Sequence, residues 1–146
     1  MSINWEFQTT DVVIAMVVIV AGFLLYFWLR KISRPELVGI SQKEIQRRWN
    51  EICGMVKVRK EMNYKLAVIE ADKLLDHILK AMNFQGDTMG DRLKLAIYRF
   101  PKLRKVVWAH RVRNQIVHEV NYSLRYGVAR LLLKLYKNAL KHLRVL

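Results

Sequence analysis

The chain has 146 residues, with 26 Lys and Arg against 12 Asp and Glu, which gives a formal net charge of +14. Its single cysteine, Cys53, excludes an intrachain disulfide and a cysteine-based metal cluster, and it is typical of a reducing compartment. The length leaves room for one small domain of about 110 residues beside an apolar N-terminal segment. From Arg92 to the C-terminus there are 14 basic residues and one acid, so this part should attract polyanions such as nucleic acid or an anionic membrane surface.

The N-terminal segment is an uncharged run of 18 residues, 12–29, with the sequence VVIAMVVIVAGFLLYFWL. As a helix it would cover about 27 Å, close to the hydrocarbon thickness of a bilayer. Trp5, Tyr26 and Trp28 are placed as interfacial aromatics would be. The first eleven residues contain no Lys or Arg, which argues against a cleaved signal peptide. We therefore predict a retained single-pass transmembrane helix over residues 12–31.

The basic residues that follow this helix predict its orientation. Arg30, Lys31 and Arg34 all lie on its C-terminal side. By the positive-inside rule, residues 1–11 should be outside the membrane and the following domain in the cytoplasm. Pro35 should end the helix, residues 32–40 should form a linker, and residues 41–146 should form the cytoplasmic domain.

Two helices are expected first in this domain. Ser41 and Glu44 form a capping-box pattern that opens a helix through about Val56. The next helix is strongly amphipathic over residues 64–82. On its polar face we expect Asp72, Asp76 and His77 to be solvated. The less favoured alternative is that the two aspartates pair with a basic helix.

Three further helices follow a turn-rich break. Thr88 and Asp91 should cap a helix through Tyr98, and Pro101 should open another that runs to about Val120. A last helix is expected from Leu124 onward. The expected core residues of these last two helices are Leu103, Val106, Val107, Ile116 and Val117, then Val128, Leu131, Leu132, Leu135, Ala139 and Leu143. With no strand-like alternation, the sequence predicts an all-α protein: one N-terminal transmembrane helix and a four- to five-helix bundle.

The stretch from Trp108 to Glu119, WAHRVRNQIVHE, gathers polar groups in an otherwise apolar and basic helix. His110, Asn114 and His118 recur every four positions and form one stripe, with Arg113 beside it. The histidines are dispersed and HExxH does not occur, so neither a metal nor any other cofactor is expected. Arg and His chemistry on a phosphate fits better, because a histidine can take a proton from a ribose 2′-hydroxyl and a guanidinium can neutralise the phosphate.

The segment from Arg113 to His118, RNQIVH, resembles the R-x4–6-H signature of HEPN domains, and the helical arrangement over residues 42–146 is similar to that family. The resemblance implies an all-α domain that often forms homodimers and acts as a metal-independent endoribonuclease leaving a 2′,3′-cyclic phosphate. Such domains act in toxin–antitoxin, phage-defence or RNA-processing systems, so RNA and a partner protein or antitoxin are the implied partners. By position, Arg113 would hold the scissile phosphate, His118 would be the general acid or base, and Asn114 would position them. His110, on the same stripe, and Glu119, directly after the motif, would be accessory.

Helix geometry bears on how such a site is built. Arg113 and His118 are five positions apart, about 140° around the helix axis, so they do not stack on each other. They could converge through the long arginine side chain or across a dimer, and a composite site is easier to build than a one-chain site.

Other interpretations stay open. Arg113 could instead pair with Glu119 or with an acid of the amphipathic helix, and His118 could cap the helix end. The protein could also be a non-catalytic adaptor, or an assembly subunit without a ligand of its own. An adaptor's last helix would bind RNA, anionic lipid or a partner protein through residues at three- or four-residue steps: Arg130, Lys134, Lys137, Lys141 and Arg144.

Overall fold

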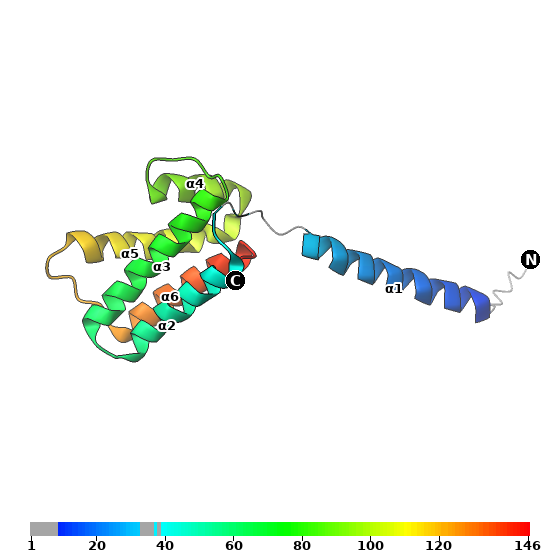
Figure 1. The fold of residues 1–146 in the computed structure, drawn as a ribbon, viewed down its shortest axis with the longest axis horizontal. Coiled ribbons are helices and arrows are strands. Elements are labelled where there is room, and N and C mark those ends of the chain that lie inside the picture. Colours follow the sequence, from blue (N-terminus) through cyan, green and yellow to red (C-terminus); the bar gives the residue numbers. More distant parts are fainter. Residues whose placement is uncertain (1–8, 33–36, 38) are drawn as a thin grey trace, which may run out of the picture. The chain divides into compact units, whose positions relative to one another are not determined.

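The computed structural model describes residues 9–32, 37 and 39–146, and within these residues all regular structure is helical. The chain divides into two units, Met1–Arg34 and Pro35–Leu146. The first contains helix α1, and the second contains five α-helices and one short 3₁₀-helix (Figure 1). The predicted all-α class is confirmed.

Helix α1 spans Thr9–Ile32. Over Asp11–Trp28 its mean hydropathy is 2.4, and none of this stretch is buried within the protein. The helix is therefore long and apolar enough to cross a membrane. Trp5 and the Arg34-Pro35 helix end lie outside the described residues, as do the side chains of Arg30 and Lys31.

Helices α2, Gln42–Lys57, and α3, Glu61–Ala81, form an antiparallel pair. Ser41 caps α2, because its hydroxyl accepts a hydrogen bond from the backbone N–H of Glu44 at 3.2 Å. The Glu44 carboxylate bonds Arg47 and Arg48, so only one half of the predicted capping box forms.

Helix α4, Met89–Arg99, begins with the complete capping box expected there. The Thr88 hydroxyl accepts from the Asp91 N–H at 3.2 Å, and the Asp91 carboxylate accepts from the Thr88 N–H at 3.3 Å. The preceding turn depends on Gly86, whose φ is +143°; a Cβ there would lie 2.8 Å from the Cβ of Asp91.

The segment from Pro101 differs from the predicted single helix to about Val120. It forms a 3₁₀-helix, Pro101–Lys105, and then α5, Val106–His118. Residues three apart eclipse each other in a 3₁₀-helix, which lets both Leu103 and Val106 reach the core. Val117 is 48% exposed, so its assignment to the core is wrong.

Helix α6, Tyr126–His142, completes the bundle, and α3 is its centre. Figure 1 shows α3 crossing α5 and lying against α2 and α6, and it also contacts α4. Leu132, Tyr136 and Leu140 of α6 are fully buried, whereas Leu131 is 48% exposed and was wrongly expected in the core.

Candidate functional site

Asp72 is the charged residue on which the site is built. It lies on α3 and is only 2% exposed, so the expectation of a solvated carboxylate was wrong. Its position continues an apolar stripe, because Val68, Leu75 and Leu79 lie four residues before and three and seven residues after it, and all are buried. That spacing was the signal in the sequence for its burial.

Three side chains from two other helices converge on this carboxylate. Tyr136 of α6 donates its hydroxyl hydrogen to Oδ1 at 2.9 Å, and Nδ1 of His110 lies 2.8 Å from the same oxygen. Arg113 of α5 places Nε 3.3 Å from Oδ2. A buried carboxylate is tolerated only with such partners, so Asp72 ties α3, α5 and α6 together.

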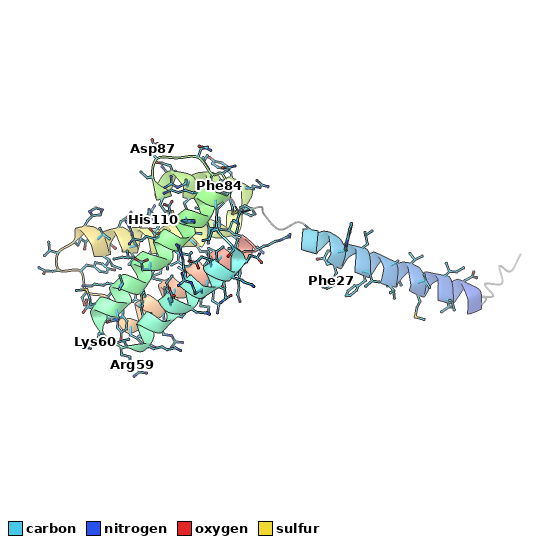
Figure 2. All side chains as sticks on the ribbon, in the orientation of Figure 1. Phe27, Arg59, Lys60, Phe84, Asp87 and His110 are labelled. Carbon is cyan, nitrogen blue, oxygen red and sulfur yellow. The ribbon has the colours of Figure 1, made fainter. Side chains whose placement is uncertain are left out.

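Asp72 and three side chains of α5 form a closed ring of contacts: Asp72, His110, Asn114 and Arg113. Arg113 donates from Nη1 to Oδ1 of Asn114 at 2.9 Å, which leaves the Asn114 amide nitrogen 3.4 Å from Nε2 of His110. Because Nδ1 of His110 faces the Asp72 carboxylate, this assignment puts the histidine proton on Nδ1 and makes Nε2 the acceptor. Figure 2 shows His110 where α5 passes α3. The ring fixes the orientation of all four side chains.

Arg113 is the least satisfied member of this ring. Its Nε lies within ion-pair distance of Asp72, yet the N–H is not aligned on the oxygen and, among the described residues, this buried donor has no hydrogen-bond acceptor. The contact is thus electrostatic rather than a hydrogen bond. The guanidinium group is thus held by the Nη1 hydrogen bond to Asn114 and by the ion pair with Asp72.

A second, partly buried ion pair lies one helical turn further along α3. Arg92 of α4 is 6% exposed, donates to Asp76 of α3 at 2.7 Å, and also bonds the carbonyl oxygen of Gly86. Burial pushes the pKa of Asp76 up, but Arg92 and Lys80 outweigh it and hold the pKa below its usual value. The expectation of a solvated Asp76 was therefore also wrong, and this pair holds the turn before α4 against α3.

A cleft of about 590 Å³ opens above these contacts, between α3, the start of α4 and α5. It brings together the three residues of the predicted stripe, His110, Asn114 and His118, and Arg113 beside it. Its opposite wall is the loop and capping segment from Asp87 to Asp91. Four acids and four Lys or Arg residues line the cleft, so its formal charges balance: Asp72, Asp76, Asp87 and Asp91, with Lys73, Arg92, Lys94 and Arg113.

His118 differs from His110 in its surroundings. It is the last residue of α5, its side chain is exposed, and no partner for it occurs within the part of the chain that the structure describes. It lines the same cleft as Arg113 of the same chain, so the two residues share one cavity without a second copy. Exposed and unbonded, His118 is the histidine that can exchange protons with a ligand.

The remaining predicted residues lie elsewhere. Glu119 is exposed, caps the end of α5 only through its backbone N–H, and does not line the cleft. Four of the predicted basic residues lie on α6, are exposed and do not line the cleft: Arg130, Lys134, Lys137 and Lys141. Arg144 is also exposed and outside the cleft, but its assignment to the last helix was wrong, because α6 ends at His142 and Arg144 has a φ of +59°. The structure thus separates the Arg/His residues from the α6 cations.

Tyr136 and the Thr88–Gly90 segment contribute to the site but were not predicted. The core stripe of α6 through Leu132, Tyr136 and Leu140 would have indicated burial of the tyrosine. No sequence pattern would have placed Gly90 opposite α5, where a Cβ would lie 3.8 Å from Nε2 of His110.

In comparisons with known proteins, no family model matches the chain, and no curated protein and no solved structure is significantly similar to it.

Proposed function

We propose that the protein is a membrane-tethered, HEPN-type, metal-independent endoribonuclease. The observation that carries this proposal is the shared cleft, in which an incompletely bonded arginine, Arg113, and an exposed, unpartnered histidine, His118, face one cavity. The R-x4–6-H pattern formed by these two residues supports the same conclusion.

The chemistry requires only a proton acceptor and a cation. His118 would take the proton of a ribose 2′-hydroxyl, whose oxygen attacks the adjacent phosphorus while the bond to the 5′-oxygen breaks and that oxygen is protonated. Arg113 would neutralise the phosphoryl oxygens as charge builds on them. The products would be a 2′,3′-cyclic phosphate and a 5′-hydroxyl end. Asp72, His110 and Asn114 would act as positioning residues that hold Arg113 toward the cleft.

The membrane-tethering part of the proposal rests on helix α1. We propose that this helix crosses a membrane once, with residues 1–11 outside and the helical domain in the cytoplasm, in agreement with Arg30, Lys31 and Arg34 on its C-terminal side. The activity would then act on RNA near the membrane, in defence, toxin–antitoxin or RNA processing.

A homodimer is proposed as the working form, as in related HEPN domains. A second copy could face the exposed end of α5, where Val117 is 48% and Val120 is 96% exposed. An antitoxin or another protein partner could use the same surface. Light scattering of the detergent-solubilised protein would measure the oligomeric state.

The test is RNA cleavage by the full-length protein in nanodiscs, in EDTA, with single-stranded and structured RNA. We expect EDTA-resistant cleavage with cyclic-phosphate ends, and its loss in His118→Ala and in Arg113→Ala. His77→Ala is the matched control, because His77 is also an exposed helical histidine but lies outside the cleft. Circular dichroism would show whether each variant keeps its helical fold.

Absence of cleavage by the wild-type protein, or full activity of folded His118→Ala, would contradict the proposal. A non-catalytic, membrane-anchored adaptor is the second candidate. One observation favours it: the ion pair with Asp72 accounts for Arg113 as a structural residue, without any substrate. In that case Arg113→Ala should lower stability without any nuclease activity to lose.

A further inference from the structure

A second cavity, separate from the Arg/His cleft, lies between the C-terminal half of α2 and the N-terminal half of α6. We call it the α2/α6 groove; its volume is about 710 Å³. Figure 1 shows the two helices side by side along this stretch. The groove is lined by Trp49, Cys53, Val56 and Lys57 of α2 and by Tyr126, Gly127, Arg130, Leu131, Leu133, Lys134 and Lys137 of α6.

The charge of the groove is of one sign. Four cations line it, Lys57, Arg130, Lys134 and Lys137, and none of its lining residues is acidic. Within the described residues none of these four side chains forms an ion pair, in contrast to the balanced charges of the Arg/His cleft. Uncompensated cations around a cavity favour an anionic ligand.

The groove also has apolar walls. Val56 and Leu133 are buried beside it, and Leu131 is half exposed on its rim. Trp49 is 3% exposed, and its indole N–H has no acceptor within the part of the chain that the structure describes. The buried indole ring of Trp49 therefore contributes apolar surface to the groove.

Two further features lie at the same place. The groove covers the first turns of α6, the positive pole of that helix, where Gly127 leaves open space because a Cβ there would touch nothing within 4 Å. The thiol of Cys53 reports the local environment: burial raises its pKa, while Lys57 and Lys137 act in the opposite direction. Two of the four lining cations are therefore near enough to the thiol to influence it.

We propose that the α2/α6 groove binds the headgroup of an anionic phospholipid. Its cations would hold the phosphate, and Leu131 with the apolar walls would contact the glycerol and the first methylenes of the acyl chains. This proposal does not depend on ribonuclease activity.

A lipid fits the groove better than RNA does. Nonspecific binding of single-stranded nucleic acid uses open aromatic faces on which bases stack. Tyr126 is a half-buried aromatic residue of the groove, and its ring centroid lies 5.4 Å from that of Tyr64. The guanidinium carbons of Arg59 and Arg130 lie 5.6 and 5.7 Å from the Tyr126 ring centroid. The Tyr126 ring is thus already in contact with three side chains. An α1 helix that crosses a membrane would also keep the bilayer at a high effective concentration, because α2 starts only ten residues after α1 ends.

The single cysteine of the chain is a native reporter for this site. We would measure the rate at which neutral N-ethylmaleimide modifies Cys53 in the full-length protein, in nanodiscs of phosphatidylcholine alone and with phosphatidic acid added. When the phosphatidic acid concentration is about ten times its dissociation constant, roughly a tenth of the grooves stay empty. The rate of Cys53 modification should therefore fall about tenfold when phosphatidic acid is added.

The double variant Lys134→Glu/Lys137→Glu should lose this protection. Its matched control, Lys102→Glu/Lys105→Glu, makes the same change of net charge at exposed lysines outside the groove and should keep it. Circular dichroism of both variants would confirm that they fold.

Three results would overturn the proposal. Equal rates in both nanodiscs would show that no headgroup occupies the groove, and equal loss of protection in both double variants would show a nonspecific charge effect. Protection by inorganic phosphate or by an RNA oligonucleotide in phosphatidylcholine nanodiscs, without protection by phosphatidic acid, would assign the groove to a different anion.

Discussion

The hydroxyl of Tyr136 donates a hydrogen bond to Oδ1 of Asp72 at 2.9 Å, across 64 positions of the sequence and inside the core. Burial and the adjacent carboxylate raise the pKa of Tyr136 well above its usual value, so the phenol is protonated and donates at neutral pH. This donor stays with Asp72 if Arg113 moves to a ligand.

Replacing Asp72 with Asn should destabilise the protein strongly. The amide keeps the shape of the side chain but leaves Arg113 without its counter-ion and turns an NH₂ group toward other donors, which should lower the free energy of unfolding by about 3 to 5 kcal/mol. Urea unfolding followed by circular dichroism would measure the change. Asp87→Asn is the control, because Asp87 is an exposed carboxylate on the rim of the same cleft and should change stability by no more than about 0.5 kcal/mol. Similar values for the two variants would show that the buried contacts contribute little.

Replacing Thr88 with Ala should cost about 1 kcal/mol of stability, because the first turn of α4 loses the hydroxyl that caps it. Thr88→Ser keeps the hydroxyl and should remain close to the wild type. Thermal unfolding of the three proteins would measure both effects. If serine were as damaging as alanine, the threonine methyl group rather than the cap would be responsible.

Acid should weaken the protein in part through Asp76. Its pKa in the folded protein lies below the usual value of about 3.9, so its ion pair contributes stability above about pH 4, and that contribution is lost as the pH falls through the folded pKa. Asp76→Asn removes the titrating group. The difference in unfolding free energy between wild type and variant should therefore shrink on acidification below pH 4, and urea titrations at several pH values would measure it. A difference that stays constant down to pH 2 would contradict this assignment.

Local patterns in the sequence predicted the helices well, because caps and amphipathic stripes depend on residues three or four positions apart. Thr88 and Asp91 marked the start of α4, and Ser41 marked that of α2. The 3₁₀-helix at Pro101 was missed because its geometry is set by how Leu103 and Val106 meet the core.

Only the part of the candidate site that lies on one helix could be predicted from the sequence. The stripe from His110 to His118 lies on one helix, so its spacing could be read directly. Asp72 and Tyr136 come from other helices, and a helical pattern does not say which distant side chain a polar residue will meet. The prediction failed where tertiary partners reversed the usual solvation of a carboxylate.

The carboxylate of Asp72 also has a consequence for the order of folding. Its contacts with His110 and Tyr136 close chain segments of 38 and 64 residues, and closing such segments costs entropy before the contacts can form. These bonds should therefore be made late, after the α2–α3 hairpin, whose helices are joined by three residues. Asp72→Asn should then act mainly on the unfolding limb of a chevron plot and leave the refolding rate nearly unchanged. The contacts of Asp72 would thus slow the unfolding of the native bundle and have little effect on its folding rate.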